Sequence, residues 1–334
     1  MENQKKLQEV NRRRFLKIAA SLTAMAYVPS CMQPKSDRWG TILPTRILGK
    51  TGLNVSMFCL GGSPPIINFD EMESITEAAF NGGCRFFETA RSYGTEPHFG
   101  KVLEPYRSDI ILSSKSRAMD ADNLTRELDL TLEALKTSYL DIYLMHNVPN
   151  LEVCQRKFDN GVWDAMLKAK QEGKVRHLGF SGHANYETNN YMLDMNLPDL
   201  EVMLMPVSVI DTVQNSFTIN TLPKAAEKNI GVMVMKSLGG GGMLGADITW
   251  GQGKGSKRPR VIPDIITLRE AQHFVYSMPV SAVSIGCISV EQVNENIALA
   301  ESFTGMNKAE QEELIKKVTD IAQNNFLEHY KGNR

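Results

Sequence analysis

The chain has 334 residues, of which 42% are apolar and 22% are charged, a composition typical of a soluble globular protein with a substantial core. Its 37 Lys and Arg residues are balanced by 38 Asp and Glu residues, so charge gives it no general affinity for nucleic acid. The five cysteines form neither a CxxC pair nor a regular framework, and no short His/Cys spacing indicates a metal site.

The first 31 residues predict a secretory signal peptide. A basic segment at 11–17 precedes an apolar run at 18–28, and Pro-Ser-Cys follows. The apolar run has about 11 residues, whereas a membrane-spanning helix needs about 20. The paired arginines ahead of Phe15 and Leu16 are typical of a twin-arginine signal, which directs folded proteins to the twin-arginine export machinery. The alternative, an amphipathic or disordered N-terminus, does not explain the signal-like order of the two segments.

The end of this leader is similar to a bacterial lipobox. Residues 28–31 read Val-Pro-Ser-Cys, with an atypical proline, so lipidation of Cys31 and ordinary cleavage both stay open. The polar segment 32–41 predicts a tether, and residues 42–334 predict the folded domain. We expect an exported bacterial protein, periplasmic or anchored as a lipoprotein, which meets the membrane only through its signal peptide or a lipid on Cys31.

Beyond the tether, short apolar runs follow one another at regular intervals. Segment Thr45–Ser56 holds Lys-Thr-Gly between two such runs, which predicts a β-hairpin. Eight further runs are nearly continuously apolar, as is typical of parallel strands buried on both faces. These predicted strands are Met57–Gly61, Cys84–Thr89, Ile110–Ser113, Ile142–Met145, His177–Phe180, Glu201–Met205, Val232–Met235 and Ala282–Ile285.

Helical stretches separate these strands. They are marked by leucines at helical spacing and by glycines that end them, and we predict helices at Asp70–Asn81, Asp122–Leu135, Gly161–Glu172, Leu222–Asn229, Val290–Ser302 and Lys308–Leu327. Eight strands alternating with helices predict an α/β fold, a (β/α)8 TIM barrel with an N-terminal β-hairpin. The alternative, a doubly wound Rossmann sheet, lacks a GxGxxG motif after the first strand. Cys59, Cys84 and Cys287 fall in apolar runs and are predicted to be buried.

Four chemically active side chains follow three successive predicted strands. Glu88 and Tyr93 lie at or just beyond the second strand, Lys115 after the third and His146 after the fourth. In a barrel these strand ends meet at one mouth, where active sites lie. A nearby ammonium favours the phenolate and is expected to lower the pKa of Tyr93, while an imidazole can orient a substrate carbonyl. Each residue alone has a structural interpretation, but their shared position favours a site for proton donation.

These segments resemble the aldo-keto reductase family. Residues 83–96, Gly-Cys-Arg-Phe-Phe-Glu-Thr-Ala-Arg-Ser-Tyr-Gly-Thr-Glu, are similar to its signature, as are Asp-Ile-Tyr-Leu-Met-His at 141–146 and Ser-Ser-Lys at 113–115. The resemblance runs from about residue 45 to 303. It implies that Tyr93 is the general acid/base, with Lys115 and His146 tuning and orienting it. The family normally has Asp where this chain has Glu88, a difference that can shift the geometry of the site.

The resemblance also implies a nicotinamide cofactor, NADP or NAD. Ser181 corresponds to a residue that holds the nicotinamide amide, although Gly182 replaces the usual Asn. No aromatic residue follows the sixth strand to stack on the ring. The remaining cofactor-binding candidates are Lys236, Ser237, Leu238 and Gly239 in a phosphate-binding loop, and Gly286, Gln292, Glu295 and Asn296 in an adenosine-binding segment. Gln292 stands where Arg often binds the 2′-phosphate, so a preference for NADP is not assured.

The sequence therefore predicts an NAD(P)-dependent oxidoreductase that transfers hydride between its cofactor and a small carbonyl or alcohol. The alternative function is a catalytically weak barrel that acts as a binding protein. Because free NAD(P)H is not expected outside the cytoplasm, we expect the protein to fold around its cofactor and to be exported loaded. The mouth loops set the substrate, and the sequence does not identify it.

Overall fold

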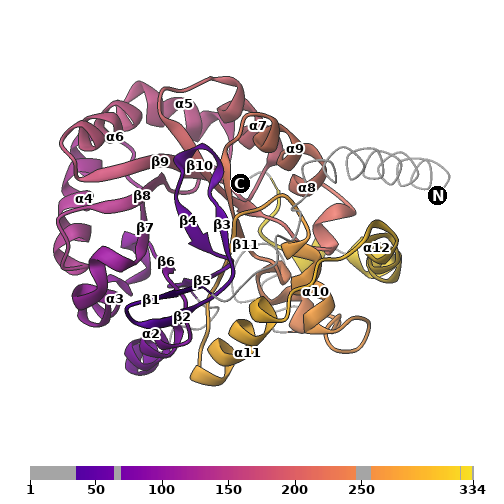
Figure 1. Cartoon of the computed structure of the whole chain (residues 1–334). Helices are drawn as coiled ribbons and strands as arrows, with labels where there is room; N and C mark the ends of the chain where they lie inside the picture. Colours follow the sequence, from indigo (N-terminus) through magenta and orange to yellow (C-terminus); the bar gives the residue numbers. More distant parts are fainter. Residues whose placement is uncertain (1–34, 64–68, 246–256, 324, 333–334) are drawn as a thin grey trace.

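The computed structural model describes residues 35–63, 69–245, 257–323 and 325–332. The predicted signal peptide, including Cys31, lies outside these residues. Eight parallel strands close into a barrel in the order β10-β11-β12-β5-β6-β7-β8-β9, and helices cover its outside (Figure 1). The predicted (β/α)8 barrel is confirmed.

The barrel strands coincide with the eight apolar runs that predicted them. Their side chains are almost entirely buried because helices cover the outer face and side chains fill the interior. The strands are β5 (Phe58–Gly61), β6 (Phe86–Glu88), β7 (Ile111–Ser116), β8 (Leu140–Met145), β9 (Val175–Ser181), β10 (Leu200–Pro206), β11 (Gly231–Met235) and β12 (Ala282–Ile285). As predicted, Cys59, Cys84 and Cys287 are buried, and each is a free thiol.

The six predicted helices are confirmed, with ends that differ by up to five residues. They are α2 (Met72–Asn81), α4 (Ala121–Ala134), α6 (Val162–Gln171), α9 (Leu222–Glu227), α11 (Val290–Glu301) and α12 (Lys308–Ala322). The sequence did not predict α3 (Glu96–Leu103), α5 (Leu151–Asp159), α7 (Tyr186–Asp194), α8 (Phe217–Asn220) and α10 (Leu268–Tyr276). These are short, and local caps such as the capping box of Thr267 and Glu270 on α10 start several of them.

The predicted N-terminal hairpin is confirmed and closes the bottom of the barrel. Strand β3 (Thr45–Ile47) pairs antiparallel with β4 (Asn54–Ser56), and the hairpin is drawn across the barrel in Figure 1. Leu48 and Val55 are fully buried and belong to the same apolar cluster as the interior barrel residues. This plug leaves the opposite end, where the strands finish, as the open mouth.

The segment expected to be a tether contains regular structure. Strand β1 (Lys35–Asp37) pairs with β2 (Gly40–Ile42), so residues 35–41 form a hairpin rather than a linker. Asp37 accepts a 2.7 Å bond from the guanidinium of Arg85, which anchors the hairpin beneath β6. This contact links positions far apart in the sequence, so a local polar pattern does not reveal it.

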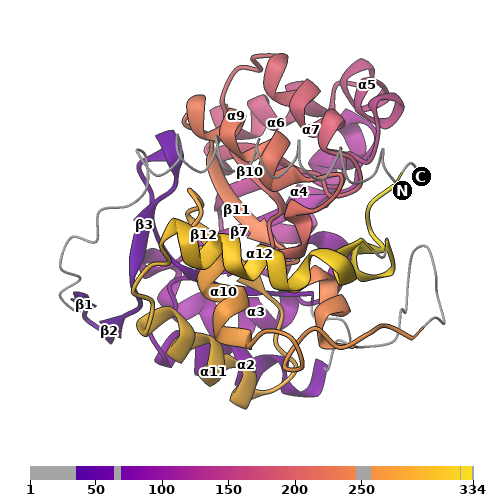
Figure 2. The same cartoon turned by 90° about the vertical axis from the view of Figure 1, so that its right-hand side faces the viewer.

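Helix α12 lies on the outside of the barrel and is followed by the last described segment, 325–332. Figure 2 shows this helix running across the face that also carries α10 and α11. The predicted helix to Leu327 therefore stops at Ala322, and the chain then turns toward the barrel mouth. Within the described residues, no helix is both long and apolar enough to cross a membrane.

Candidate active site

The candidate residues divide the barrel mouth into two adjoining halves. Glu88 ends β6, Lys115 lies near the end of β7, and His146 follows β8, so these polar groups share three neighbouring strands. The cofactor candidates follow β9, β11 and β12, on the other side of the same closed barrel. The strand order therefore places the residues suited to proton transfer in one half of the mouth and the cofactor-binding candidates in the adjoining half. We call these the proton-transfer half and the cofactor half.

The carboxylate of Glu88 forms a buried ion pair with the ammonium of Lys115 through Oε1. Its other oxygen, Oε2, accepts a 2.9 Å bond from the hydroxyl of Ser284 on β12. The lysine also donates to the carbonyl oxygen of Thr89 at 2.8 Å. The longer Glu side chain thus reaches Lys115, and both of its oxygens have partners.

Tyr93 lies over this ion pair, in the short 3₁₀ helix η3 (Arg91–Tyr93). The Lys115 ammonium is 4.4 Å from the centre of its ring, and the His146 ring meets it edge-on with centroids 5.6 Å apart. Burial raises the pKa of the Tyr93 phenol, while the charge of Lys115 offsets only part of that rise. The expected lowering of the pKa of Tyr93 was therefore wrong in net direction, and the phenol stays protonated at neutral pH.

Lys115 and His146 hold opposite protonation states. Burial disfavours the charge of Lys115, but the interactions with Glu88 and Tyr93 together outweigh this effect and raise the pKa of the ammonium. Burial, together with the cationic charges of Lys115 and Arg117, holds the pKa of His146 well below its usual range. His146 is thus a neutral imidazole that can donate or accept a hydrogen bond, and its buried Nδ1 has no partner among the described residues.

The cofactor half presents polar groups and a glycine-rich loop. Ser181 ends β9, and its hydroxyl accepts a 3.0 Å bond from the backbone N–H of Asn147, which leaves its proton to donate. The Ser237 hydroxyl is bonded to Gln272 at 3.3 Å, while Leu238 is partly buried before the loop. Lys236 has φ 59°, and Gly239 has φ 63°, so the chain after β11 turns through left-handed backbone.

The candidates in the predicted adenosine-binding segment, at 286–296, make hydrogen bonds mainly to one another and to neighbouring backbone groups. Gln292 uses its side-chain oxygen to accept from the backbone N–H of Ile288 at 3.0 Å. Asn296 is buried and donates to the carbonyl of Gln292 at 2.8 Å. Glu295 is exposed, and Gly286 is partly exposed after β12. These contacts shape the start of α11, and of the four residues only Glu295 presents an exposed charge.

Sequence reasoning missed Ser284 and Asn189. Asn189 on α7 is fully buried and donates to the Gly182 carbonyl at 3.1 Å. A Cβ on Gly182 would lie 2.0 Å from Asn189 Oδ1, so the Asn189 carboxamide fills the place of a side chain at 182. That oxygen has no donor in the described part of the chain. A buried acceptor without a partner is costly, which favours a donor supplied by a bound molecule.

A family model described as the aldo/keto reductase family matches residues 57–324 of the chain. The chain belongs to the aldo/keto reductase family. The match spans the barrel and both halves of its mouth, and membership implies NAD(P)-dependent oxidoreductase activity.

Relatives and solved structures agree with this assignment. L-galactose dehydrogenase of Arabidopsis thaliana is 28% identical over 294 residues, covering 77% of this chain and 88% of that protein. The holo form of an aldo-keto reductase from Bacillus halodurans has a TM-score of 0.66 at 22% identity, covering 83% and 96% of the two chains. A Bombyx mori aldo-keto reductase in complex with NADP has a TM-score of 0.64 at 16% identity, covering 83% and 93%. The two structures support the fold.

The described residues offer no competing metal centre. Across residues 35–63, 69–245, 257–323 and 325–332, no group of three or more His, Cys, Asp or Glu side chains is placed to hold a metal ion. Ser181 as a donor and the Oδ1 of Asn189 as an acceptor suit a ligand that carries a carboxamide. The polar groups of the mouth therefore fit a nicotinamide.

Proposed function

We propose that this protein transfers hydride between a bound nicotinamide cofactor and a small carbonyl or alcohol, with Tyr93 as general acid/base. The observation that carries this proposal is the placement of a protonated phenol over the buried Glu88–Lys115 pair. Hydride is supplied by the cofactor, and the phenol supplies the proton. The neutral imidazole of His146 beside the Tyr93 ring orients the substrate oxygen.

The ion pair acts through Tyr93. During carbonyl reduction the phenol gives up its proton, and the developing phenolate lies near the Lys115 ammonium. Glu88 keeps that ammonium charged and, with the carbonyl of Thr89, fixes its position. Ser181 and Asn189 would hold the carboxamide of the nicotinamide, and Lys236 and the glycines after Leu238 would hold the phosphates of the cofactor. Gln292 offers no cation to a 2′-phosphate, so both NAD and NADP are accepted.

We expect purified protein to bind both reduced cofactors and to turn over a carbonyl substrate. Binding is measured by the fluorescence change of NADPH and NADH on titration, and turnover by loss of absorbance with a panel of aldehydes and sugars, including L-galactose. The sugar is chosen because a relative is an L-galactose dehydrogenase. If the purified protein neither contains nicotinamide cofactor nor binds it on titration, the proposed enzymatic function is wrong. Binding without turnover across the panel would favour the second function, a binding barrel.

We also propose that the leader directs the protein out of the cytoplasm. The arginines at 12–14 and the apolar run after Lys17 support recognition by the twin-arginine machinery, which carries folded proteins. The chain thus leaves the cytoplasm with its cofactor already bound, and reaches the periplasm or, if Cys31 is lipidated, the membrane surface. The mass of the processed N-terminus distinguishes lipidation of Cys31 from ordinary cleavage.

We expect replacement of the paired arginines to retain the protein in the cytoplasm. The double variant Arg12→Lys with Arg13→Lys keeps the charge but removes the guanidinium groups. Cell fractionation followed by immunoblotting measures the distribution. The matched control, Lys5→Arg with Lys6→Arg, also keeps the charge and should leave export unchanged. An unchanged distribution of the arginine variant would count against this route, and exported protein without cofactor would count against loading before export.

A further inference from the structure

The segment Leu327–Gly332 packs against the barrel, and its residues 327–330 are buried. Here Leu327 is fully buried, Glu328 is 3% exposed and Tyr330 is 1% exposed. The segment begins within η7 (Asn325–Glu328), which comes after α12, and lies against the barrel mouth. Specific contacts therefore hold it there.

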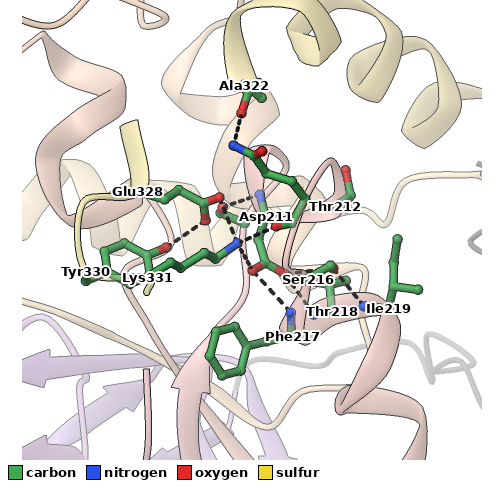
Figure 3. A network of polar contacts seen from close by, with 12 residues as sticks. Asp211, Thr212, Ser216, Phe217, Thr218, Ile219, Ala322, Glu328, Tyr330 and Lys331 are labelled. Carbon is green, nitrogen blue, oxygen red and sulfur yellow. Dashed lines mark hydrogen bonds and ion pairs between the residues drawn. The ribbon is translucent and has the colours of Figure 1, made fainter. Parts of the chain in front are cut away.

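An ion cluster ties this segment to the loop after β10. The Lys331 ammonium lies 2.7 Å from Asp211 Oδ1 and 2.7 Å from Glu328 Oε2 (Figure 3). It also donates to the carbonyl of Gln214 at 3.0 Å. The Tyr330 hydroxyl donates to the other oxygen of Glu328 at 2.8 Å. Lys331 is thus the one cation shared by both carboxylates in the drawn network.

Asp211 belongs firmly to the barrel side of this cluster. It lies in the 3₁₀ helix η5 (Ile210–Thr212) and is fully buried. Its Oδ2 accepts from the backbone N–H of Thr218 at 2.7 Å and from the hydroxyl of Ser216 at 3.1 Å, at the start of α8. Asp211 therefore keeps local partners when Lys331 leaves, and the segment can detach without disrupting η5.

The segment packs directly on the glycine-rich loop of the cofactor half. A Cβ on Gly242 would lie 2.2 Å from the carbonyl oxygen of Leu327, and one on Gly239 would lie 3.0 Å from it. A Cβ on Gly240 would contact Tyr330 at 3.7 Å. The Lys236 ammonium lies 5.3 Å from the centre of the Tyr330 ring. Any lifting of the loop must therefore displace the C-terminal segment.

The other end of the segment reaches the loop after β9. The backbone N–H of Gly332 donates to the Ala184 carbonyl at 3.0 Å, and the rings of His183 and Tyr330 lie 6.1 Å apart. The segment thus contacts the chain after β9, η5 after β10 and the loop after β11. These are three neighbouring strands of the barrel.

Burial acts against the charges of this cluster. Burial raises the pKa of the Glu328 carboxyl to about 6, and the nearby Asp211 charge adds to this rise while Lys331 opposes it. Burial also opposes the charge of Lys331, but Asp211 and Glu328 raise its pKa overall. The cost of desolvating buried ions offsets much of their attraction. Detachment of the segment would return the charges of Lys331 and Glu328 to water, which offsets part of the attraction that is lost.

We propose that the segment Leu327–Gly332 is a clasp that keeps the loop 236–242 closed over the nicotinamide cofactor, and that Lys331 fastens it to Asp211. This inference rests on the proposed function, because it assigns a role to the loop of the same cofactor site. The clasp sets how long the cofactor stays bound. A long residence time is what a protein needs if it is exported with its cofactor already bound.

The test is the release rate of NADPH from wild type and from Lys331→Met, followed by fluorescence after a chase with excess NADP. The variant removes the charge and keeps the apolar stem, so we expect release roughly 10- to 100-fold faster. The matched control is Lys317→Met, which breaks the partly exposed ion pair between Lys317 on α12 and Glu270 on α10 and should leave the rate unchanged. Glu328→Gln, which keeps the Lys331–Asp211 pair, serves if Lys331→Met does not fold, and should give a smaller increase.

A second readout does not depend on the cofactor. Hydrogen exchange of the backbone amides at 327–332, measured on protein without cofactor, should be faster in Lys331→Met than in wild type. Faster exchange with an unchanged release rate would overturn the clasp while leaving the proposed function intact. Unchanged exchange would show that Lys331 does not fasten the segment and would also overturn it. If wild type binds no nicotinamide, the proposed function fails and the clasp fails with it.

Discussion

Tyr93→Phe should lower turnover by about 10²- to 10⁴-fold while leaving cofactor affinity unchanged. The substitution removes only the hydroxyl and keeps the ring that lies over Lys115 and beside His146. The site then lacks its proton donor, because the Lys115 ammonium is held by Glu88 and His146 is neutral. The measurement is single-turnover reduction of a carbonyl substrate by enzyme loaded with NADPH, alongside a fluorescence titration of the cofactor.

The control for this variant is Tyr106→Phe. The Tyr106 ring stacks on Phe80 with centroids 3.9 Å apart, on the outside of the barrel, so loss of its hydroxyl should not affect turnover. If Tyr93→Phe retained wild-type turnover, another group would have to supply the proton. A parallel loss of cofactor binding would instead indicate that the hydroxyl has a structural role.

The protonation state of the Tyr93 phenol determines how the rates of reduction and oxidation change with pH. Burial raises the pKa of Tyr93 above its ordinary value of 10, so the proton-donating form is fully present at neutral pH. Reduction therefore falls as pH rises through that raised pKa, while oxidation, which needs the phenolate, increases over the same range. The low pKa of His146 adds no inflection near neutrality.

The mouth was largely predictable because its residues follow from the barrel pattern. In a parallel barrel each strand end points to the same rim, so Glu88, Lys115 and His146 needed only correct strand assignments to be brought together. Glu88 could not be judged from its identity alone. Its extra methylene is accommodated because Ser284, from β12 on the other side of β5, binds the second carboxylate oxygen.

Other features depend on contacts between segments that no local pattern connects. Lys331 and Asp211 lie far apart in the sequence, and their contact requires α12 and the segment after it to pack on the barrel. The pKa of Tyr93 could not be predicted from the sequence for a similar reason. The nearby Lys115 could be inferred from strand order, but the burial that outweighs its charge could not.

Lys115→Met should reduce the free energy of unfolding by about 3–5 kcal/mol, because it leaves the buried carboxylate of Glu88 without its counter-ion. Ser284 remains as a single neutral donor to that carboxylate, and the carbonyl of Thr89 also loses its donor. The measurement is denaturant unfolding of the protein without cofactor, so that cofactor binding does not contribute. The matched control is Lys136→Met, whose ion pair with Glu104 is about half exposed and is expected to contribute about 0–1 kcal/mol.

The double variant Glu88→Gln with Lys115→Met separates the cost of a stranded charge from the loss of the lysine itself. If an unpaired carboxylate causes the instability, the double variant should be more stable than Lys115→Met alone, since the neutral amide needs no counter-ion. Equal stability of the two variants would contradict this explanation. Turnover should remain low in both, because neither has an ammonium to stabilise the Tyr93 phenolate. Stability and activity would then respond differently to the same pair, as expected if the Glu88–Lys115 pair serves the chemistry of Tyr93 as well as the fold.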